Sequence, residues 1–309
     1  MSTITVFAPA TSANIGPGFD VLGVAIDGLG DTVTVRRRAE AGVVIEHIEG
    51  DGGRLPRKAE KNTAGIAAQE TLRLLGVQDG VVLRLEKGLP LGSGLGSSAA
   101  SAVAAAWAVN VLFGQRLSKQ ALLHACLVAE ASVGGWHADN VGPALFGGFL
   151  LIRSYDPLDL IQLPTPNNLF FILVTPDYEL LTMMAREVLP KSISLQQHIA
   201  NNGNLAAFVA ALFKNSPALL GRAVEDCIVE PARAPLIPGF SAVKAAALEA
   251  GALGCSISGA GPTLFALSDD YNKATRIAHA MQHAFQVHGK LNSRVHIAPV
   301  DTQGARTVT

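Results

Sequence analysis

Residues 90–100 read Pro90, Leu91, Gly92, Ser93, Gly94, Leu95, Gly96, Ser97, Ser98, Ala99 and Ala100. Three glycines at every second position, followed by two serines and an apolar run, predict a loop that leads into the N-terminus of a buried helix. Glycines let backbone amides approach an anion closely, and a helix end adds unpaired N–H donors with a partial positive charge. A tight turn with one serine as helix cap would not need three glycines, so the pattern favours phosphate binding.

The type of phosphate loop follows from the residues around it. No lysine follows the glycines, which excludes a Walker A loop. Gly94, Gly96 and Ala99 fit the dinucleotide pattern G-x-G-x-x-A, but that fingerprint requires a strand ending at the glycines and an acidic residue about 20 positions later. Here the preceding strand is expected to end near Leu85, and no acidic residue lies between Glu86 and Glu130. The Rossmann interpretation therefore fails.

The composition excludes several classes of protein. The chain has 309 residues, a net charge of −1, 49% apolar residues and 16% charged residues, which is neither disordered nor strongly basic. The apolar run 99–113 is shorter than the roughly 20 residues of a membrane span and is interrupted by Asn110. Three widely spaced cysteines and a start without signal-peptide features indicate a cytoplasmic protein. We expect the protein to act on a small-molecule substrate and to bind neither nucleic acid nor a membrane. A homodimer is possible.

Hydrophobic periodicity predicts strands interleaved with helices in both halves, hence an α+β fold. Expected strands lie at 3–7, 31–35, 43–48, 81–85, 147–152, 169–174, 255–258, 263–267 and 294–298. Expected helices lie at 63–75, from 97 onward, and at 119–133, 182–190, 204–213, 241–250 and 272–287. The stretch 155–168 contains no clear element, which places a boundary between domains 1–160 and 161–309.

Glu130 falls on the apolar stripe of the helix expected at 119–133, with Leu123, Cys126 and Leu127. A buried carboxylate is costly unless it is paired or bound to a metal. A salt bridge to an arginine and a Mg²⁺ site completed by a hydroxyl of Ser97 or Ser98 and by nucleotide oxygens are equally compatible with this spacing.

The residues of four other segments can also be explained by an ordinary structural role, without any function. Asn14 and Asp20 lie in a turn-rich break, where local hydrogen bonds explain them. The motif 137–140 follows two glycines and is expected in a loop, and His137 lacks a partner at zinc-ligand spacing. Arg186 and Arg233 would by default be solvated. The glycine-rich segment 258–262 is either a tight hairpin or a second wall of a site.

Six segments together resemble the GHMP small-molecule kinases, and within them the subfamily that phosphorylates L-homoserine. They are the loop 90–100 and the motifs PATSANIGPGFD at 9–20, HADN at 137–140, AREVLP at 185–190, EPAR at 230–233 and GCSISGAGPT at 254–263. The resemblance extends over residues 3–306. The glycine loop is characteristic of the whole family, and the motifs at 9–20, 185–190 and 230–233 are characteristic of the subfamily.

The resemblance implies a two-domain fold with a ribosomal-protein-like N-terminal α/β domain, a ferredoxin-like C-terminal domain, and ATP-dependent phosphorylation on the route to threonine. Asn14 and Asp20 would hold the substrate α-amino group, and Arg186 and Arg233 its α-carboxylate. His137, Asn140 and Thr182 would lie near the acceptor hydroxyl. Ser98 and Glu130 would take Mg²⁺, and Asn62 and Lys87 would lie near the nucleotide together with the loop 90–100.

Physical chemistry agrees with this allocation. A zwitterionic amino acid needs a carboxylate at one end of its pocket and cations at the other, and a guanidinium suits a carboxylate bidentately. Phosphoryl transfer depends mainly on positioning and charge neutralisation, so a strong base is optional. Asp139 is a candidate base, but we expect direct transfer with Asn140 orienting the hydroxyl. Another kinase of the family, acting on a sugar or isoprenoid alcohol, and a non-enzymatic binding module are the alternatives.

Overall fold

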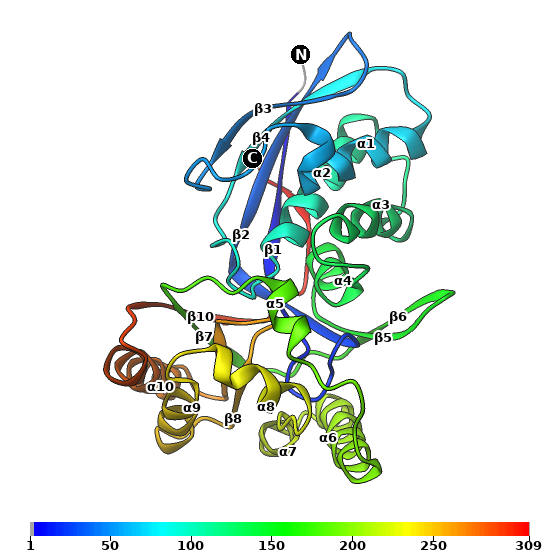
Figure 1. Ribbon diagram of the computed structural model, residues 1–309. Coiled ribbons are helices and arrows are strands. Elements are labelled where there is room, and N and C mark those ends of the chain that lie inside the picture. The colour runs from blue at the N-terminus through cyan, green and yellow to red at the C-terminus, as the bar shows by residue number, and fades with distance from the viewer. Residues whose placement is uncertain (1–2, 309) are drawn as a thin grey trace.

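The computed structural model describes residues 3–308, which form two sheets, each covered by helices (Figure 1). The first sheet has seven strands, in the order β11-β1-β2-β4-β3, with β5 pairing with β2 and β6 with β5. Its strands are β1 (Thr3–Ala13), β2 (Leu22–Arg38), β3 (Val43–Glu49), β4 (Gly80–Glu86), β5 (Phe149–Tyr155), β6 (Leu158–Leu163) and β11 (Arg306–Val308). Its helices are η1 (Ala59–Lys61), α1 (Thr63–Leu75), α2 (Ser97–Leu112), α3 (Lys119–Ala131) and α4 (Ala138–Phe146).

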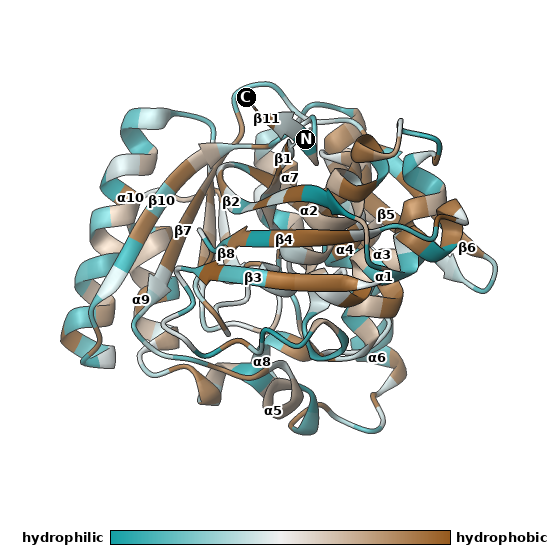
Figure 2. Ribbon diagram, turned by 90° about the horizontal axis from the view of Figure 1, so that it is seen from above, coloured by the Kyte–Doolittle hydropathy of each residue, from teal (hydrophilic) through white to brown (hydrophobic). Residues whose placement is uncertain are grey.

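The second sheet has four antiparallel strands in the order β10-β7-β9-β8, and α9 and α10 pack together against it. Its strands are β7 (Phe170–Pro176), β8 (Gly254–Ile257), β9 (Leu264–Ser268) and β10 (Ser293–Pro299). The helices of this part are α5 (Thr182–Glu187), α6 (Leu195–Phe213), α7 (Pro217–Ala223), α8 (Val229–Arg233), η2 (Ala234–Leu236), α9 (Phe240–Glu249), α10 (Tyr271–Ala284) and the π-helical turn η3 (Phe285–Gly289). In Figure 2, β4 and β7 are largely brown, whereas teal segments mark α10 at the edge.

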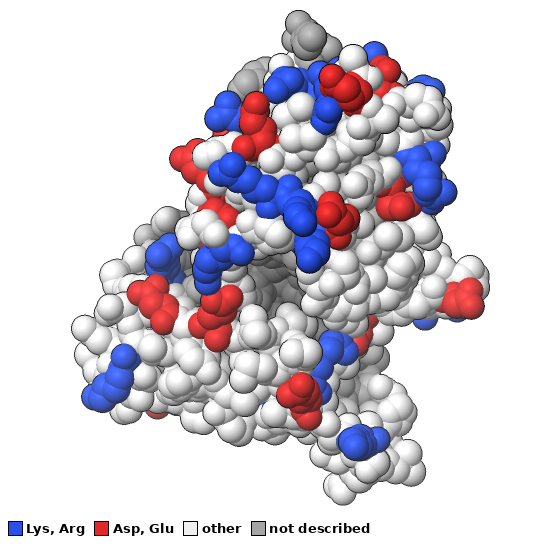
Figure 3. Space-filling view, turned by 45° about the horizontal axis from the view of Figure 1, so that its top comes forward, with Lys and Arg blue, Asp and Glu red and all other residues white. Residues whose placement is uncertain are grey.

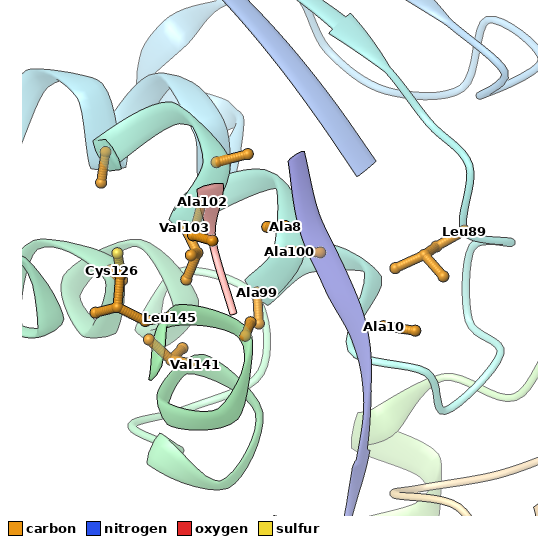
Figure 4. Packing of buried hydrophobic residues seen from close by; sticks show 14 of the residues in the cluster. Ala8, Ala10, Leu89, Ala99, Ala100, Ala102, Val103, Cys126, Val141 and Leu145 are labelled. Carbon is orange, nitrogen blue, oxygen red and sulfur yellow. The ribbon is translucent and has the colours of Figure 1, made fainter. Parts of the chain in front are cut away.

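The centre of the first part is α2, which is buried on nearly all sides because it consists mainly of alanine and valine. Small side chains let it lie between β1 and β2 of the sheet and the helices α1, α3 and α4. Figure 4 shows Ala100 of α2 beside the strand that carries Ala8 and Ala10, and Val103 on the side of Cys126 and Leu145 from the neighbouring helices. This packing fixes the N-terminal end of α2, where the glycine loop ends.

The expected α+β class is confirmed, and so are most elements, including α1 with Gly76 as its left-handed C-cap. Some expectations were wrong. The stretch 155–168 contains β6, and the motif 137–140 is not in a loop, because α4 begins at Ala138. The break at 8–20 is shorter than expected, because β1 continues to Ala13 while paired with β2.

The second half also holds more structure than the sequence predicted. Helix α6 begins nine residues earlier than expected, at Leu195 instead of 204, and α7, α8 and β11 were not anticipated. The division into 1–160 and 161–309 stays a prediction. Strand β6 belongs to the first sheet because it pairs with β5. Strand β11 brings the end of the chain back to the same sheet, where it pairs with β1. Within residues 3–308, no helix combines the length and the apolar character that crossing a membrane requires.

Candidate functional site

A cavity of about 580 Å³ lies between the two parts, and Figure 3 shows lysines and arginines gathered around a hollow in the surface. Residues far apart in the sequence line the cavity. They include most of the predicted site residues, namely Asn14, Asp20, Asn62, Lys87, Leu91, Gly92, Ser93, Gly94, Gly96, Ser97, Ser98, Glu130, His137, Asn140, Thr182, Arg186 and Arg233. Of the predicted loop residues, Pro90, Leu95, Ala99 and Ala100 do not line it, and the last three are buried in the core.

The glycine loop has the geometry of an anion site. Gly94 and Gly96 adopt left-handed backbone conformations, with φ of 78° and 67°. Gly96 is also the N-cap of α2, and no side chain caps this helix. The interpretation of Ser97 or Ser98 as a simple cap is therefore wrong. The first N–H groups of α2 remain available to a ligand at the positive end of the helix dipole.

The segment 258–262 forms a second wall behind this loop. The Ser258 hydroxyl donates to the Gly94 carbonyl oxygen at 2.8 Å, and the Thr263 amide donates to the Ser93 carbonyl at 3.2 Å. A Cβ on Gly94 would overlap the Ser258 carbonyl oxygen. Both sequence interpretations of 258–262 hold, since the segment connects β8 to β9 and also supports the glycine loop.

Lys87 is buried beneath the loop and paired with Asp31 of β2. Its Nζ also donates to the Ser97 carbonyl at 2.8 Å and to the Ser101 hydroxyl at 2.7 Å. Asp31 in turn accepts the backbone amides of Gly88 and Leu89, both at 3.1 Å. Burial lowers the pKa of Lys87, and the Asp31 carboxylate opposes that shift. The pair ties β2, the loop entrance and α2 into one frame.

Asp31 was missed by the sequence analysis, although a signal was present. Along the alternating strand β2, Asp31, Val33 and Val35 share the buried face. A carboxylate on that face needs a cationic partner.

Asn62 was predicted near the nucleotide. It lines the cavity, and its side chain caps α1 through the Ala64 amide at 3.0 Å and donates to the Pro56 carbonyl at 3.0 Å.

The carboxylate of Glu130 lies next to the start of α2. The Ser98 hydroxyl donates to Oε1 at 2.9 Å, and Oε2 is buried without a hydrogen-bond partner. Glu130 forms no ion pair with a described arginine, so the salt-bridge alternative finds no support within residues 3–308. Burial raises the pKa of Glu130 to about 7, against the lowering effects of Ser98 and Lys87. An unsatisfied carboxylate oxygen beside a serine hydroxyl and a glycine loop is a donor set that fits Mg²⁺.

Oppositely charged side chains meet at the other end of the cavity. Arg186 of α5 donates to Asp20 Oδ1 at 2.7 Å, and its Nη2 lies 3.3 Å from Nδ1 of His137. Since Arg186 can only donate, His137 Nδ1 accepts, and its Nε2–H donates to the Gly134 carbonyl at 3.0 Å. Burial lowers the pKa of His137. The sequence default of a solvated Arg186 is wrong, because its Nε is buried without a partner.

Arg233 of α8 is also buried, with 2% of its surface exposed. Its guanidinium donates to the backbone carbonyls of Gly259 at 2.9 Å and Ala185 at 3.0 Å. Burial and the nearby Arg186 lower the pKa of Arg233 to about 10. Both guanidiniums lie 5.3 Å from the ring centre of Phe19. The aromatic face stabilises two neighbouring cations that would otherwise repel each other.

Asn14, Asn140 and Asp139 connect the two ends. Asn14 accepts the Asp20 amide at 3.1 Å and donates to the Gly259 carbonyl at 2.8 Å. Asn140, in the first turn of α4, accepts the Thr11 hydroxyl at 2.7 Å. Asp139 is buried, and burial together with Asp20 and Glu130 raises its pKa to about 7. Thr182 at the start of α5 is exposed on the cavity wall.

Two family models match this chain. The model of the GHMP kinases N-terminal domain matches residues 62–148, and that of the GHMP kinases C-terminal domain matches residues 208–287. The chain belongs to the GHMP kinase family. The first match contains the glycine loop, Lys87 and Glu130, so the glycine-loop end of the cavity lies within a part that the family model matches.

Relatives within the GHMP family are similar over 85% or more of their length and over nearly all of this chain. Homoserine kinase of Arabidopsis thaliana is 51% identical over 99% of this chain and 85% of its own length. Homoserine kinase of Chlorobium phaeobacteroides (strain BS1) is 47% identical, with both chains covered completely. The crystal structure of homoserine kinase from Cytophaga hutchinsonii superposes with a TM-score of 0.97 at 49% identity, covering 100% of this chain and 98% of that one.

Proposed function

We propose that this GHMP kinase transfers the γ-phosphoryl group of ATP to the side-chain hydroxyl of L-homoserine, producing O-phospho-L-homoserine for threonine biosynthesis. The observation that carries the proposal is the charge arrangement opposite the glycine loop, where Asp20 lies against Arg186 and Arg233 is buried beside it. The identity to full-length homoserine kinases supports the same substrate.

A carboxylate side chain next to two guanidinium groups suits an amino acid as substrate. The α-ammonium and α-carboxylate are attached to the same carbon, so the groups that recognise them must also be neighbours. Asp20 would accept from the ammonium, while Arg186 and Arg233 donate to the carboxylate. The Asp20–Arg186 pair keeps both charges compensated before substrate arrives, and a zwitterion replaces that internal contact with two of its own.

The polyphosphate of ATP would lie against the backbone amides of the glycine loop and the N-terminus of α2. Ser98 and Glu130 would hold Mg²⁺, which supplies neutralisation of the charge on the phosphate oxygens. Lys87 acts from below by fixing the loop through the Ser97 carbonyl, since its Nζ is already paired with Asp31.

In the transfer, the substrate hydroxyl oxygen forms a bond to the γ-phosphorus while the bond from that phosphorus to the β–γ bridging oxygen breaks. ADP leaves with the bonding electron pair, and the hydroxyl proton passes to a phosphoryl oxygen. Neutral His137 and Asn140 orient the acceptor. Asp139 also lines the cavity, and we retain direct transfer to a phosphoryl oxygen as the proposal.

A coupled ADP-release assay with homoserine, threonine, serine, mevalonate and galactose tests the proposal. We expect kcat/KM for homoserine to exceed that for serine, because the shorter side chain does not bring its hydroxyl to the same place. Turnover of mevalonate or galactose without turnover of homoserine would contradict it, because neither has an ammonium for Asp20. For the location, we propose the cytoplasm, since all three cysteines are free thiols.

A further inference from the structure

Thr11 lies in the motif at 9–20, was given no role from the sequence, and contacts both the glycine loop and the start of α4. It lies near the end of β1 and is completely buried. Its backbone amide donates to the Leu95 carbonyl of the glycine loop at 3.1 Å, and its hydroxyl donates to Asn140 Oδ1 at 2.7 Å. A Cβ on Gly96 would overlap the Thr11 hydroxyl oxygen and lie 2.9 Å from Asn140 Oδ1. One threonine therefore joins the phosphate loop to the start of α4.

The hydroxyl of Thr11 determines what Asn140 can do. A carboxamide has one acceptor end and one donor end. With Oδ1 accepting from Thr11, the NH₂ group is the end left for the cavity that Asn140 lines. Asn140 can then donate hydrogen bonds to a ligand through this NH₂ group, and a neutral carboxamide does not act as a base toward a hydroxyl proton.

We propose that Thr11 is a positioning residue for phosphoryl transfer. It holds the Asn140 amide with its NH₂ group toward the oxygens that develop charge between the γ-phosphorus and the acceptor. This inference rests on the proposed function, and it specifies a donor role for Asn140 at that site. Donors fixed before the reaction stabilise developing negative charge without reorganisation, so the contribution appears in kcat rather than in substrate binding.

The first test compares Thr11→Val, which keeps the shape and removes the hydroxyl, with Thr11→Ser, which keeps the hydroxyl. We expect Thr11→Val to lower kcat about 10- to 100-fold with both KM values within about twofold, because a fixed buried hydrogen bond is lost. Thr11→Ser should retain kcat within about threefold. Thr71→Val is the matched control, because Thr71 is equally buried and its hydroxyl donates to the Ala67 carbonyl at 2.7 Å. An unchanged kcat in Thr11→Val would overturn the proposal.

The second test asks whether Thr11 acts through Asn140. In an Asn140→Ala background, adding Thr11→Val should change kcat less than about twofold, whereas independent effects would multiply. Asn140→Asp separates the two orientations of the amide. It should be at least as impaired as Asn140→Ala, because a carboxylate replaces the donor. Asn140→Asp with higher kcat than Asn140→Ala would contradict the donor role.

A readout without turnover separates this inference from the proposed function. In a ¹H–¹⁵N spectrum, the side-chain NH₂ signals of Asn140 are identified by their absence in Asn140→Ala. We expect Thr11→Val to shift or broaden these signals, while Thr71→Val leaves them in place. If wild-type protein bound nucleotide but did not phosphorylate homoserine, the proposed function would fail while this contact could still be scored. Unshifted signals in Thr11→Val would reject the contact itself.

Discussion

The two ends of the cavity are built in different ways. The proposed nucleotide end uses a continuous segment, residues 90–98, which leads into the uncapped N-terminus of α2 above the buried Lys87–Asp31 pair. The proposed amino-acid end uses side chains from four segments far apart in sequence, Asp20, His137, Arg186 and Arg233. A site made from backbone can be encoded locally and shared by a family, whereas a site made from side chains changes with single substitutions. Losing a supporting side chain at the first end should therefore lower the free energy of unfolding. Losing a side chain at the second end should lower the affinity for the substrate.

The largest effect is expected when the frame beneath the nucleotide end is broken. Lys87→Met leaves Asp31 as an uncompensated buried charge, and breaking such a pair costs about 3–5 kcal/mol in free energy of unfolding. Urea denaturation measures it. Arg36→Ala is the control, because its pair with Glu46 is exposed and should contribute less than about 1 kcal/mol. Equal losses in the two variants would show that burial of the Lys87 pair does not matter.

The amino-acid end should respond through substrate binding. Arg233→Ala removes a buried guanidinium and should cost about 2–5 kcal/mol of transition-state stabilisation. The value of kcat/KM for homoserine should therefore fall by more than tenfold, while the KM of ATP changes little. Arg186→Ala should act in the same direction. Steady-state kinetics with each substrate varied in turn provides the measurement. Unaltered homoserine kinetics in both variants would reject the pocket assignment.

Glu130, which lies next to the start of α2, gives a pH-dependent prediction. Its pKa is about 7 in the folded chain, against an ordinary value of 4.5 for a glutamate side chain. Between these values the folded chain binds a proton that the unfolded chain lacks, so this group's contribution to stability decreases as pH rises. Glu130→Gln removes that slope and should gain on the order of 2 kcal/mol relative to wild type between pH 5 and pH 8, without Mg²⁺.

The same variant tests the metal role. Glu130→Gln should need a higher Mg²⁺ concentration for half-maximal activity, while the exposed control Glu46→Gln should match wild type. Denaturation midpoints across pH and Mg²⁺ titrations of activity provide the two measurements. A wild-type Mg²⁺ titration in Glu130→Gln would exclude this carboxylate as a ligand.

The smallest effect is expected from the shape of the loop. Gly94→Ala adds a Cβ that meets the Ser258 carbonyl at a left-handed position, which should cost about 1–3 kcal/mol in stability and raise the KM of ATP. Gly76→Ala is a matched control, because Gly76 is also left-handed and nothing lies near its missing Cβ. If both variants lose the same stability, backbone strain alone explains the effect, and contact with the 258–262 segment contributes nothing.

Sequence patterns predicted elements wherever local geometry controls them. The strands from 43–48 and 81–85 and the helix 63–75 were found because alternation and helical spacing were clear. Residues 195–203 of α6 were missed because their exposed mixture of polar and apolar residues carries no clear period. The start of α4 was missed for a related reason, since two glycines before His137 resemble a loop and no side chain caps the helix.

The sequence alone determined the phosphate loop and the helix that follows it, because alternating glycines and an alanine-rich run act on the backbone within a few residues. It also supplied the resemblance from which the substrate residues were named. Only the tertiary structure decided that Asp31 pairs with Lys87, that Arg233 is buried beside Arg186, and that the Thr11 hydroxyl donates to Asn140. The Asp31–Lys87 and Thr11–Asn140 contacts join residues 56 and 129 positions apart in the sequence, where burial sets the electrostatic energy and no local pattern indicates the partner.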